Sequence, residues 1–229
     1  MNYKKLLKEV EEHVLAYFDT HHDPKLVYHN LDHTKDVVKS TIQIANHYQL
    51  NEKDFFIVAT SAWFHDTGYF EDANNHEQKS ADLAVEFLKK NEVKADIRDQ
   101  VMQVILSTKM PQRPTNQLEN IVCDGDLFNL GTEDFRKKGK LIHKEVKLLY
   151  NVNINKREWR QKDIEFLENH QYHTDYCNLL LNDQKQKNLE KLKSKLKEEE
   201  PVEVVISSEK EKDEPKLLNK KDKQSLTKE

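Results

Sequence analysis

Apolar side chains recur at the spacing of an α-helix along most of the chain, which leaves few folds open to it. The first stripe consists of Leu6, Val10, Val14 and Phe18. Residues three or four positions apart share one face of a helix, so each stripe can be buried against other helices. Further stripes predict helices over residues 37–48, 51–65, 81–88, 97–105, 121–131, 135–150, 164–167 and 189–196. We expect Asn51 and Thr132 to cap the helices that follow them.

Composition agrees with a helical fold and excludes several classes of protein. The 229 residues include four glycines and five prolines, too few for a turn-rich all-β fold. The formal net charge of −4 lacks the basic excess of a nucleic-acid-binding protein. No run approaches the roughly 18 apolar residues of a membrane span, and the charged N-terminus has no signal-peptide core. The two cysteines have no disulfide or metal-type spacing, so we expect a cytoplasmic protein.

A change of composition near Glu198 divides the chain. Residues 1–197 are long enough for one domain with a substantial core. Residues 198–229 are mostly Glu, Lys, Asp, Ser and Pro, and such a segment buries too little apolar area to offset its ordering entropy. We predict a disordered charged tail there. The alternative is a linker to a partner domain.

Histidine and aspartate residues gather near the ends of the expected helices. His33 lies where a helix should begin. His65 and Asp66 close the helix that starts near Asn51, and Asp126 lies on or beside a short later helix. Side chains at the ends of several helices can converge, as they do in the metal sites of helical bundles. Imidazole and carboxylate ligands without a thiolate suit Mn, Fe, Co, Ni, Zn or Mg.

These residues also have ordinary structural interpretations. A single histidine near an apolar stripe is usually a packed or surface residue, and His65-Asp66 alone could equally be a capping or hydrogen-bonded pair. Their order favours a metal site, because His65 follows His33 by 32 residues and Asp126 follows Asp66 by 60. We expect Gly68 to give the backbone freedom to turn after the pair.

Four ordered motifs resemble the HD superfamily of metal-dependent phosphohydrolases, over about residues 5–197. The motifs are YHNLDHT at 28–34, AWFHDTGY at 62–69, HEQKSA at 76–81 and DGDLFNLG at 124–131. The resemblance implies an all-α HD-domain helical bundle with a divalent-metal site between its helices. The metal ligands that it implies are His33, His65, Asp66 and Asp126.

The segment after the fifth expected helix bears on the number of metal ions. Many binuclear HD enzymes carry additional histidines there, whereas residues 107–114 read STKMPQRP. We therefore expect one divalent metal ion.

Other residues are candidates for catalysis and substrate binding. Asp66 would act in catalysis as a ligand, and His76 or Glu77 would orient water, protonate the leaving group or contact the substrate. The alternative for Glu77 is an ordinary acidic residue that complements a helix dipole. The candidates for binding substrate are Lys109, Arg113, Lys144 and His173, although each lysine or arginine could instead be a solvated surface residue.

The leading functional hypothesis is a metal-dependent phosphohydrolase or phosphodiesterase that acts on a nucleotide or other small phosphoester. The alternative is a catalytically weak nucleotide-binding sensor or regulatory domain. The motifs look like those of one bacterial HD-domain subgroup. Some relatives in that subgroup look fused to a membrane-spanning effector half in bacterial signalling or defence proteins, and this chain would then be the detached half. A purely structural helical protein would leave the clustered histidines and acids unexplained. The sequence does not determine the exact substrate or the oligomeric state.

Overall fold

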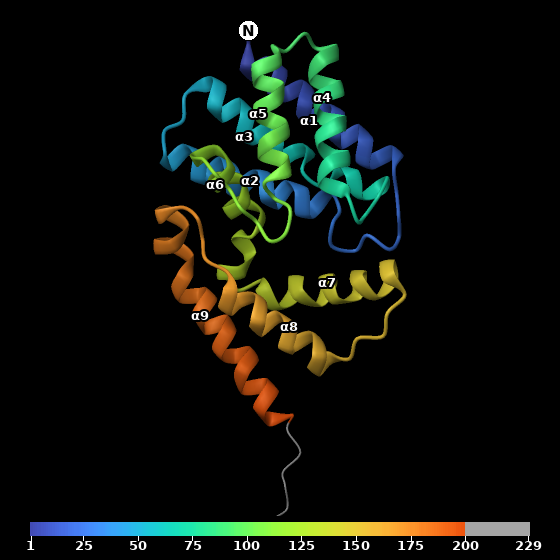
Figure 1. Cartoon of the computed structure of the whole chain (residues 1–229), viewed down its shortest axis with the longest axis vertical. Helices are drawn as coiled ribbons and strands as arrows, with labels where there is room; N and C mark the ends of the chain where they lie inside the picture. Colours follow the sequence, from blue (N-terminus) through green and yellow to red (C-terminus); the bar gives the residue numbers. More distant parts are fainter. Residues whose placement is uncertain (200–229) are drawn as a thin grey trace, which may run out of the picture. The chain divides into compact units, whose positions relative to one another are not determined.

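The computed structural model describes residues 1–199, and within that range it is built from α-helices and two short 3₁₀ helices (Figure 1). The predicted all-α class is therefore confirmed. The N-terminal helices are α1 Tyr3–Thr20, α2 Leu31–His47, α3 Glu52–Phe64, α4 His76–Lys90 and α5 Ala95–Leu106. They are followed by α6 Gln117–Asp126, α7 Phe135–Tyr150, α8 Lys156–Asn169 and α9 Asp175–Glu198. The 3₁₀ helices are η1 Thr67–Phe70 and η2 Phe128–Gly131.

Two expectations concern the remainder of the chain and its relation to membranes. Residues 200–229, which make up most of the predicted charged tail, lie outside the described residues. Within residues 1–199, none of the helices combines the length and the hydropathy that crossing a membrane requires.

Helix α3 forms the centre of the core. All of its side chains from Phe56 to Phe64 are buried. A helix that is apolar on every side is stable where other helices surround it, and α3 packs against α1, α2, α5 and α6. Burying one large apolar side chain contributes roughly 1.5–3 kcal/mol, so this segment fixes where its C-terminal end can lie. That end is where the chain continues into His65 and Asp66.

Asparagine caps fix the starts of the helices that lead into the candidate site. The Asn30 side chain accepts hydrogen bonds from the backbone N–H groups of Asp32 and His33 at the start of α2. The predicted cap by Asn51 is confirmed, since its side chain accepts from the backbone of Asp54. Each such cap contributes about 1 kcal/mol to helix stability.

The predicted cap by Thr132 is wrong. The residue that precedes α7 is Asp134, and its side chain makes no capping hydrogen bond. Thr132 instead donates its hydroxyl hydrogen to the carbonyl of Asn129 at 3.0 Å. Its own carbonyl accepts from the backbone of Phe135, because the chain still turns after η2 at this point.

Polar contacts of α6 and η2 attach helix α9 to the rest of the domain. The buried carboxylate of Asp124 accepts from the backbone N–H groups of His173 and Thr174, each at 2.8 Å, and from the Thr174 hydroxyl at 2.6 Å. Asn188 on α9 donates to the carbonyls of Leu130 and Thr132. Asp124 therefore anchors the start of α9.

His170, which follows α8, is half-buried beside a lysine. The amino group of Lys185 lies 3.3 Å from His170 Nδ1 and also donates to the His170 carbonyl. Burial, with a smaller contribution from Lys185, lowers the pKa of His170 from 6.5 to about 3. The unfolded chain therefore binds more protons than the folded protein between these two values, and stability falls as pH drops below 6.5.

We predict that His170 makes the protein less stable by about 2 kcal/mol at pH 5 than at pH 7, since the unfolded imidazole gains its proton in this interval. The free energy of urea unfolding should be measured at both pH values for the wild type and for His170→Asn. The variant should lose less stability than the wild type on acidification. Parallel losses in the two proteins would contradict the assigned role of His170.

Candidate metal centre

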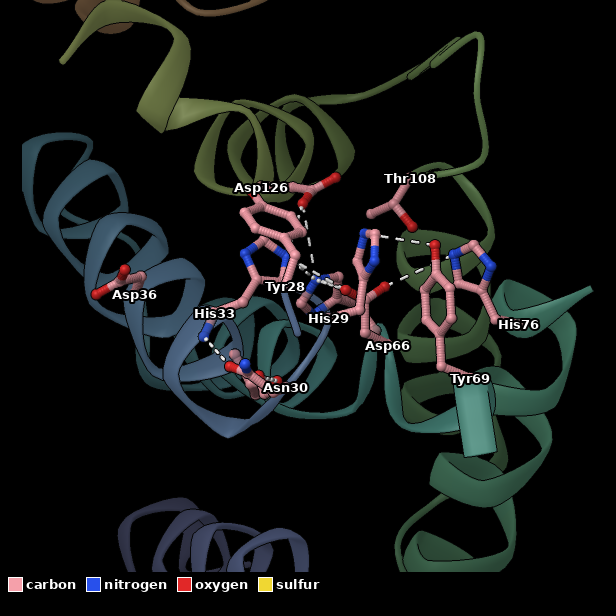
Figure 2. A network of polar contacts seen from close by, with 12 residues as sticks. Tyr28, His29, Asn30, His33, Asp36, Asp66, Tyr69, His76, Thr108 and Asp126 are labelled. Atoms are coloured by element: carbon pink, nitrogen blue, oxygen red, sulfur yellow. Dashed lines mark hydrogen bonds and ion pairs between the residues drawn. The ribbon is translucent and has the colours of Figure 1, made fainter. Parts of the chain in front are cut away.

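Four of the predicted residues lie at helix ends that meet at one place. His33 is in the first turn of α2, His65 and Asp66 follow the last residue of α3, and Asp126 is the last residue of α6. Figure 2 shows His33, Asp66 and Asp126 pointing toward one another from three separate elements. The structure thus brings together the whole ligand set that the motifs imply.

Ring nitrogens and carboxylate oxygens converge at distances that suit a shared cation. Asp66 Oδ2 lies 3.0 Å from His65 Nε2 and 3.2 Å from His33 Nε2. Asp126 Oδ1 lies 3.7 Å and 3.5 Å from the same two nitrogens. The nitrogens themselves are 3.4 Å apart. Two imidazole and two carboxylate ligands of this kind fit a borderline or hard divalent ion.

The second nitrogen of His65 explains why Nε2 is available as a ligand. His65 Nδ1 lies 2.9 Å from the carbonyl oxygen of Ala62, which can only accept a hydrogen bond. The proton is therefore assigned to Nδ1, and the lone pair remains on Nε2. A backbone carbonyl that fixes the histidine tautomer in this way is a common partner of metal-bound imidazole.

Burial makes the charges of this group interdependent. Exposed fractions are 5% for His33, 1% for His65 and 5% for Asp66. Burial alone would lower the pKa of His33, but its hydrogen bonds with Asp126 and Asp66 raise it to about 9. Burial likewise opposes ionisation of Asp66, yet His65 and His33 hold its pKa well below the ordinary value. Beyond the two imidazoles, Asp66 Oδ2 has no hydrogen-bond partner among the described residues, which agrees with a place for a cation.

A stack of three aromatic rings forms one wall beside Asp66. The Tyr69 ring lies between His29, at a centroid distance of 4.2 Å, and His76, at 3.9 Å. His76 Nε2 is 3.6 Å from Asp66 Oδ1 and 3.5 Å from Glu77 Oε1. The structure therefore places the predicted helper residue His76 next to the candidate ligand Asp66 (Figure 2). The other predicted helper residue, Glu77, lies on the far side of that contact, beside His76.

Glu145, in the middle of α7, is an acidic residue that the sequence analysis did not single out. Its carboxylate is 1% exposed and accepts from the backbone N–H groups of Tyr28 and His29 at 2.7 and 3.0 Å. It also accepts from Nδ1 of His29 in a short contact. His29 Nε2 then faces the Tyr69 hydroxyl at 3.4 Å.

This carboxylate–histidine pair resembles the outer partners that orient metal ligands. The ligand atoms of His29, His33 and Asp66 lie within 4.8 Å of one another, as do those of His33, His65 and Asp126. His29 is therefore a further candidate ligand. The sequence offered one signal for it, its place in the YHNLDHT motif.

A cavity of about 310 Å³ opens beside the candidate ligands. Its lining includes apolar side chains and Lys162 of α8. The candidate ligands and helper residues that line it are Asp66, His76, Glu77 and Asp126. The predicted substrate-binding residues are not among its lining residues, and all of them have exposed side chains: Lys109, Arg113, Lys144 and His173. Their role in binding stays a prediction, whereas Lys162 is a cation that the sequence analysis did not select.

Gly68 has a different role from the one expected. Its φ angle is not positive, so the backbone does not use the left-handed region that glycine permits. A Cβ atom there would lie 2.2 Å from the carbonyl oxygen of His76 and 2.7 Å from the backbone nitrogen of Ser80. Glycine is thus required for the close approach between η1 and the start of α4, which places His76 beside Asp66.

Comparison with solved structures relates this architecture to a known fold. The chain is similar to the crystal structure of a predicted HD superfamily hydrolase from an uncultured Thermotogales bacterium, at 19% sequence identity and a TM-score of 0.56. The match covers 86% of this chain and 99% of that one. Neither the family models nor the curated proteins give a match to the chain. The expected resemblance to the HD superfamily is confirmed for the fold.

We predict that Mn²⁺ raises the melting temperature of the purified protein, because an ion that binds the folded state at 100 times its Kd adds about 2.7 kcal/mol. Asp66→Asn keeps the shape of the side chain and removes its charge. It should weaken Mn²⁺ binding in calorimetry by more than 100-fold, since loss of an outer partner alone costs roughly 10- to 100-fold.

His22→Ala is the matched control, because this histidine is exposed and lies outside the candidate ligand groups. Its affinity for Mn²⁺ should equal that of the wild type. Absence of stabilisation by Mn²⁺, Co²⁺ and Ni²⁺ alike would contradict a metal centre at this position.

Glu145→Gln should destabilise the protein by about 1–3 kcal/mol, because it weakens a buried charged acceptor that serves three donors. It should also lower Mn²⁺ affinity by roughly 10-fold through the orientation of His29. Glu133→Gln, at an exposed acid just before α7, is the control for both measurements. Unchanged denaturant unfolding of Glu145→Gln would show that the pair does not hold this wall in place.

Proposed function

We propose that this chain is a member of the HD superfamily and acts as a metal-dependent phosphohydrolase on a nucleotide or other small phosphoester. The observation that supports the proposal best is the convergence of His33, His65, Asp66 and Asp126 at the edge of a cavity. The HD-type fold of the similar solved structure agrees with it. Metal identity stays open among Mn, Fe, Co, Ni, Zn and Mg.

The proposed ligands would hold one divalent ion, which would supply a more acidic bound water and a polarised phosphoryl oxygen. The chain itself would provide a largely buried surrounding, in which charges interact more strongly than in water. Asp66 would keep its negative charge there, because the two imidazoles hold its pKa low.

We propose that two residues, His76 and Glu77, handle a proton near the reacting phosphate. His76 Nδ1 lies 3.1 Å from the carbonyl of Ala73, so its proton is assigned to Nδ1 and Nε2 is left to face Asp66 and Glu77. Glu77 is 6% exposed, and its Oε2 has no hydrogen-bond partner among the described residues. We propose that Glu77 accepts or donates the proton at this oxygen, with His76 positioned beside it.

The cavity supports a small substrate. Its volume of about 310 Å³ lies at the lower end of the range of roughly 300–1,000 Å³ for small-molecule sites. Met110, Leu127 and Phe166 give it an apolar part that a base or sugar could contact, and Lys162 offers a positive charge for phosphate. A mononucleotide or a molecule of similar size therefore fits best.

We predict that the full chain with Mn²⁺ or another divalent ion releases phosphate or nucleoside monophosphate from at least one member of a nucleotide and phosphoester panel. Asp66→Asn should lower kcat/KM by on the order of 10²- to 10³-fold, the effect of removing one strong electrostatic group from an active site. Asp19→Asn changes an exposed acid on α1 in the same way and should leave the rate unchanged.

The same panel separates hydrolysis from sensing. Stoichiometric nucleotide binding without turnover under any metal condition would contradict the hydrolase proposal and favour the regulatory alternative. Hydrolysis that survives both Asp66→Asn and chelation would show that another site, or a contaminant, is responsible.

A further inference from the structure

A second cavity, larger than the first, lies among α7, α8 and α9. Its volume is about 640 Å³. The three helices lie together in the lower part of the described unit in Figure 1. None of the proposed metal ligands lines this cavity, and its wall is distinguished by basic residues from all three helices: Arg136, Lys140, Lys156, Arg160, Lys191 and Lys195.

The positive charge of this cavity is mostly uncompensated. Two acidic residues, Asp163 and Glu199, line it beside the six cations. Arg160 forms an ion pair with Glu199. Within residues 1–199, the other five cations make no ion pair, in contrast to Lys138 and Lys193, which pair with acids outside the cavity.

The ionisation of the lining groups agrees with an excess of positive charge. Burial and the nearby cations Arg136, Arg160 and Lys140 lower the pKa of Lys195. Burial raises the pKa of Asp163 to about 7, even though Arg160 acts in the opposite direction. The carboxyl group of Asp163 is therefore partly neutral near pH 7, and it offsets less of the surrounding charge.

Aromatic side chains contribute to the same wall. The rings of His143 and Trp159 are stacked at a centroid distance of 4.8 Å and an interplanar angle of 18°. His143 Nε2 lies 2.8 Å from the carbonyl oxygen of Ile154, which fixes the ring through a contact with the loop between α7 and α8. Trp159 and Asp163 also line the cavity beside the candidate metal centre, so the two cavities share part of a wall.

The size of the cavity and the charge of the whole chain restrict the ligand. A volume of about 640 Å³ lies within the range of small-molecule sites, whereas a nucleic acid is normally bound along an extended basic face. The chain as a whole has a net charge of −4, so a cavity with six cations and two acids differs from the average charge of the chain. Lysine and arginine together are the usual partners of phosphate oxygens.

We propose that the cavity lined by α7, α8 and α9 binds a small polyanion with several phosphate groups, as a site separate from the metal centre. The inference does not rest on the proposed hydrolase activity, because it concerns different residues and a different charge. Its cations come from three helices, so a bound polyanion would also hold these helices together.

The test is calorimetric titration of the full chain with inorganic triphosphate in a chelator, so that no divalent ion contributes. The wild type should bind one triphosphate per chain. Lys140→Glu combined with Lys191→Glu should weaken binding at least 10-fold, because two cations at the cavity become anions. Lys191→Gln alone should weaken it by a smaller factor.

The matched control is Lys137→Glu combined with Lys187→Glu. These exposed lysines lie on the same two helices, and the charge change is the same, but neither lines the cavity. The control should bind triphosphate within about twofold of the wild type once both are measured at 0.15 M ionic strength, where exposed charges are screened beyond about 8 Å.

A variant of the candidate metal centre separates the two sites. Asp126→Asn should bind triphosphate as the wild type does. Without a divalent ion this substitution removes a repelling charge from the metal cavity, so tighter binding than in the wild type would assign the anion to that cavity and overturn the proposal. Equal weakening in the cavity and control variants would also overturn it, since the effect would then be general surface charge. Absence of triphosphate binding by the wild type would overturn it as well.

Discussion

The buried carboxylate of Asp66 faces the imidazoles of His33 and His65, and the packing around the candidate centre depends on this arrangement. An isolated charge at this depth would cost several kcal/mol, so the acid and the two rings are tolerable only together. Since the three residues come from the start of α2 and the end of α3, their mutual compensation fixes how these helices meet. Asp126 then brings the end of α6 to the same point.

Local patterns account for the parts that sequence analysis predicted. The apolar stripes indicate helices, because a helix is determined by residues within one or two turns of each other. The HD-like motifs place the candidate ligands at helix ends. The roles of single residues at helix boundaries were less predictable. Thr132 carries the chemistry of a cap, but the 3₁₀ turn before it uses its hydroxyl elsewhere. Gly68 is expected from sequence to free the backbone for a turn, whereas the restriction on it comes from α4, which packs against it.

A different reason prevents the sequence from showing which residues of helices α7, α8 and α9 contribute to the candidate site and to the second cavity. Glu145 is one acid on an amphipathic helix, and nothing near it in sequence distinguishes it from its solvated neighbours. Lys162 and the six cations of the second cavity are equally hard to identify from sequence, because helices α7, α8 and α9 are rich in charge throughout. Three-dimensional packing decides which of these charges line a cavity, and several of them, Lys162 included, stay exposed there. Lys109, Arg113 and Lys144 are of the same chemical type and are exposed as well, but they line neither cavity.

The contact between His29 and Glu145 has a consequence for the order in which the protein is assembled. The two residues are separated by 116 positions, and the chain leaves the ribosome N-terminus first. The residues of helices α1 to α6, which carry most of the apolar core, are therefore synthesised before Glu145. Contacts of such long sequence separation form late, because the chain between them must first be ordered. The core can thus be present in the nascent chain while the ring stack beside Asp66 is still incomplete, and this wall is finished only when α7 docks.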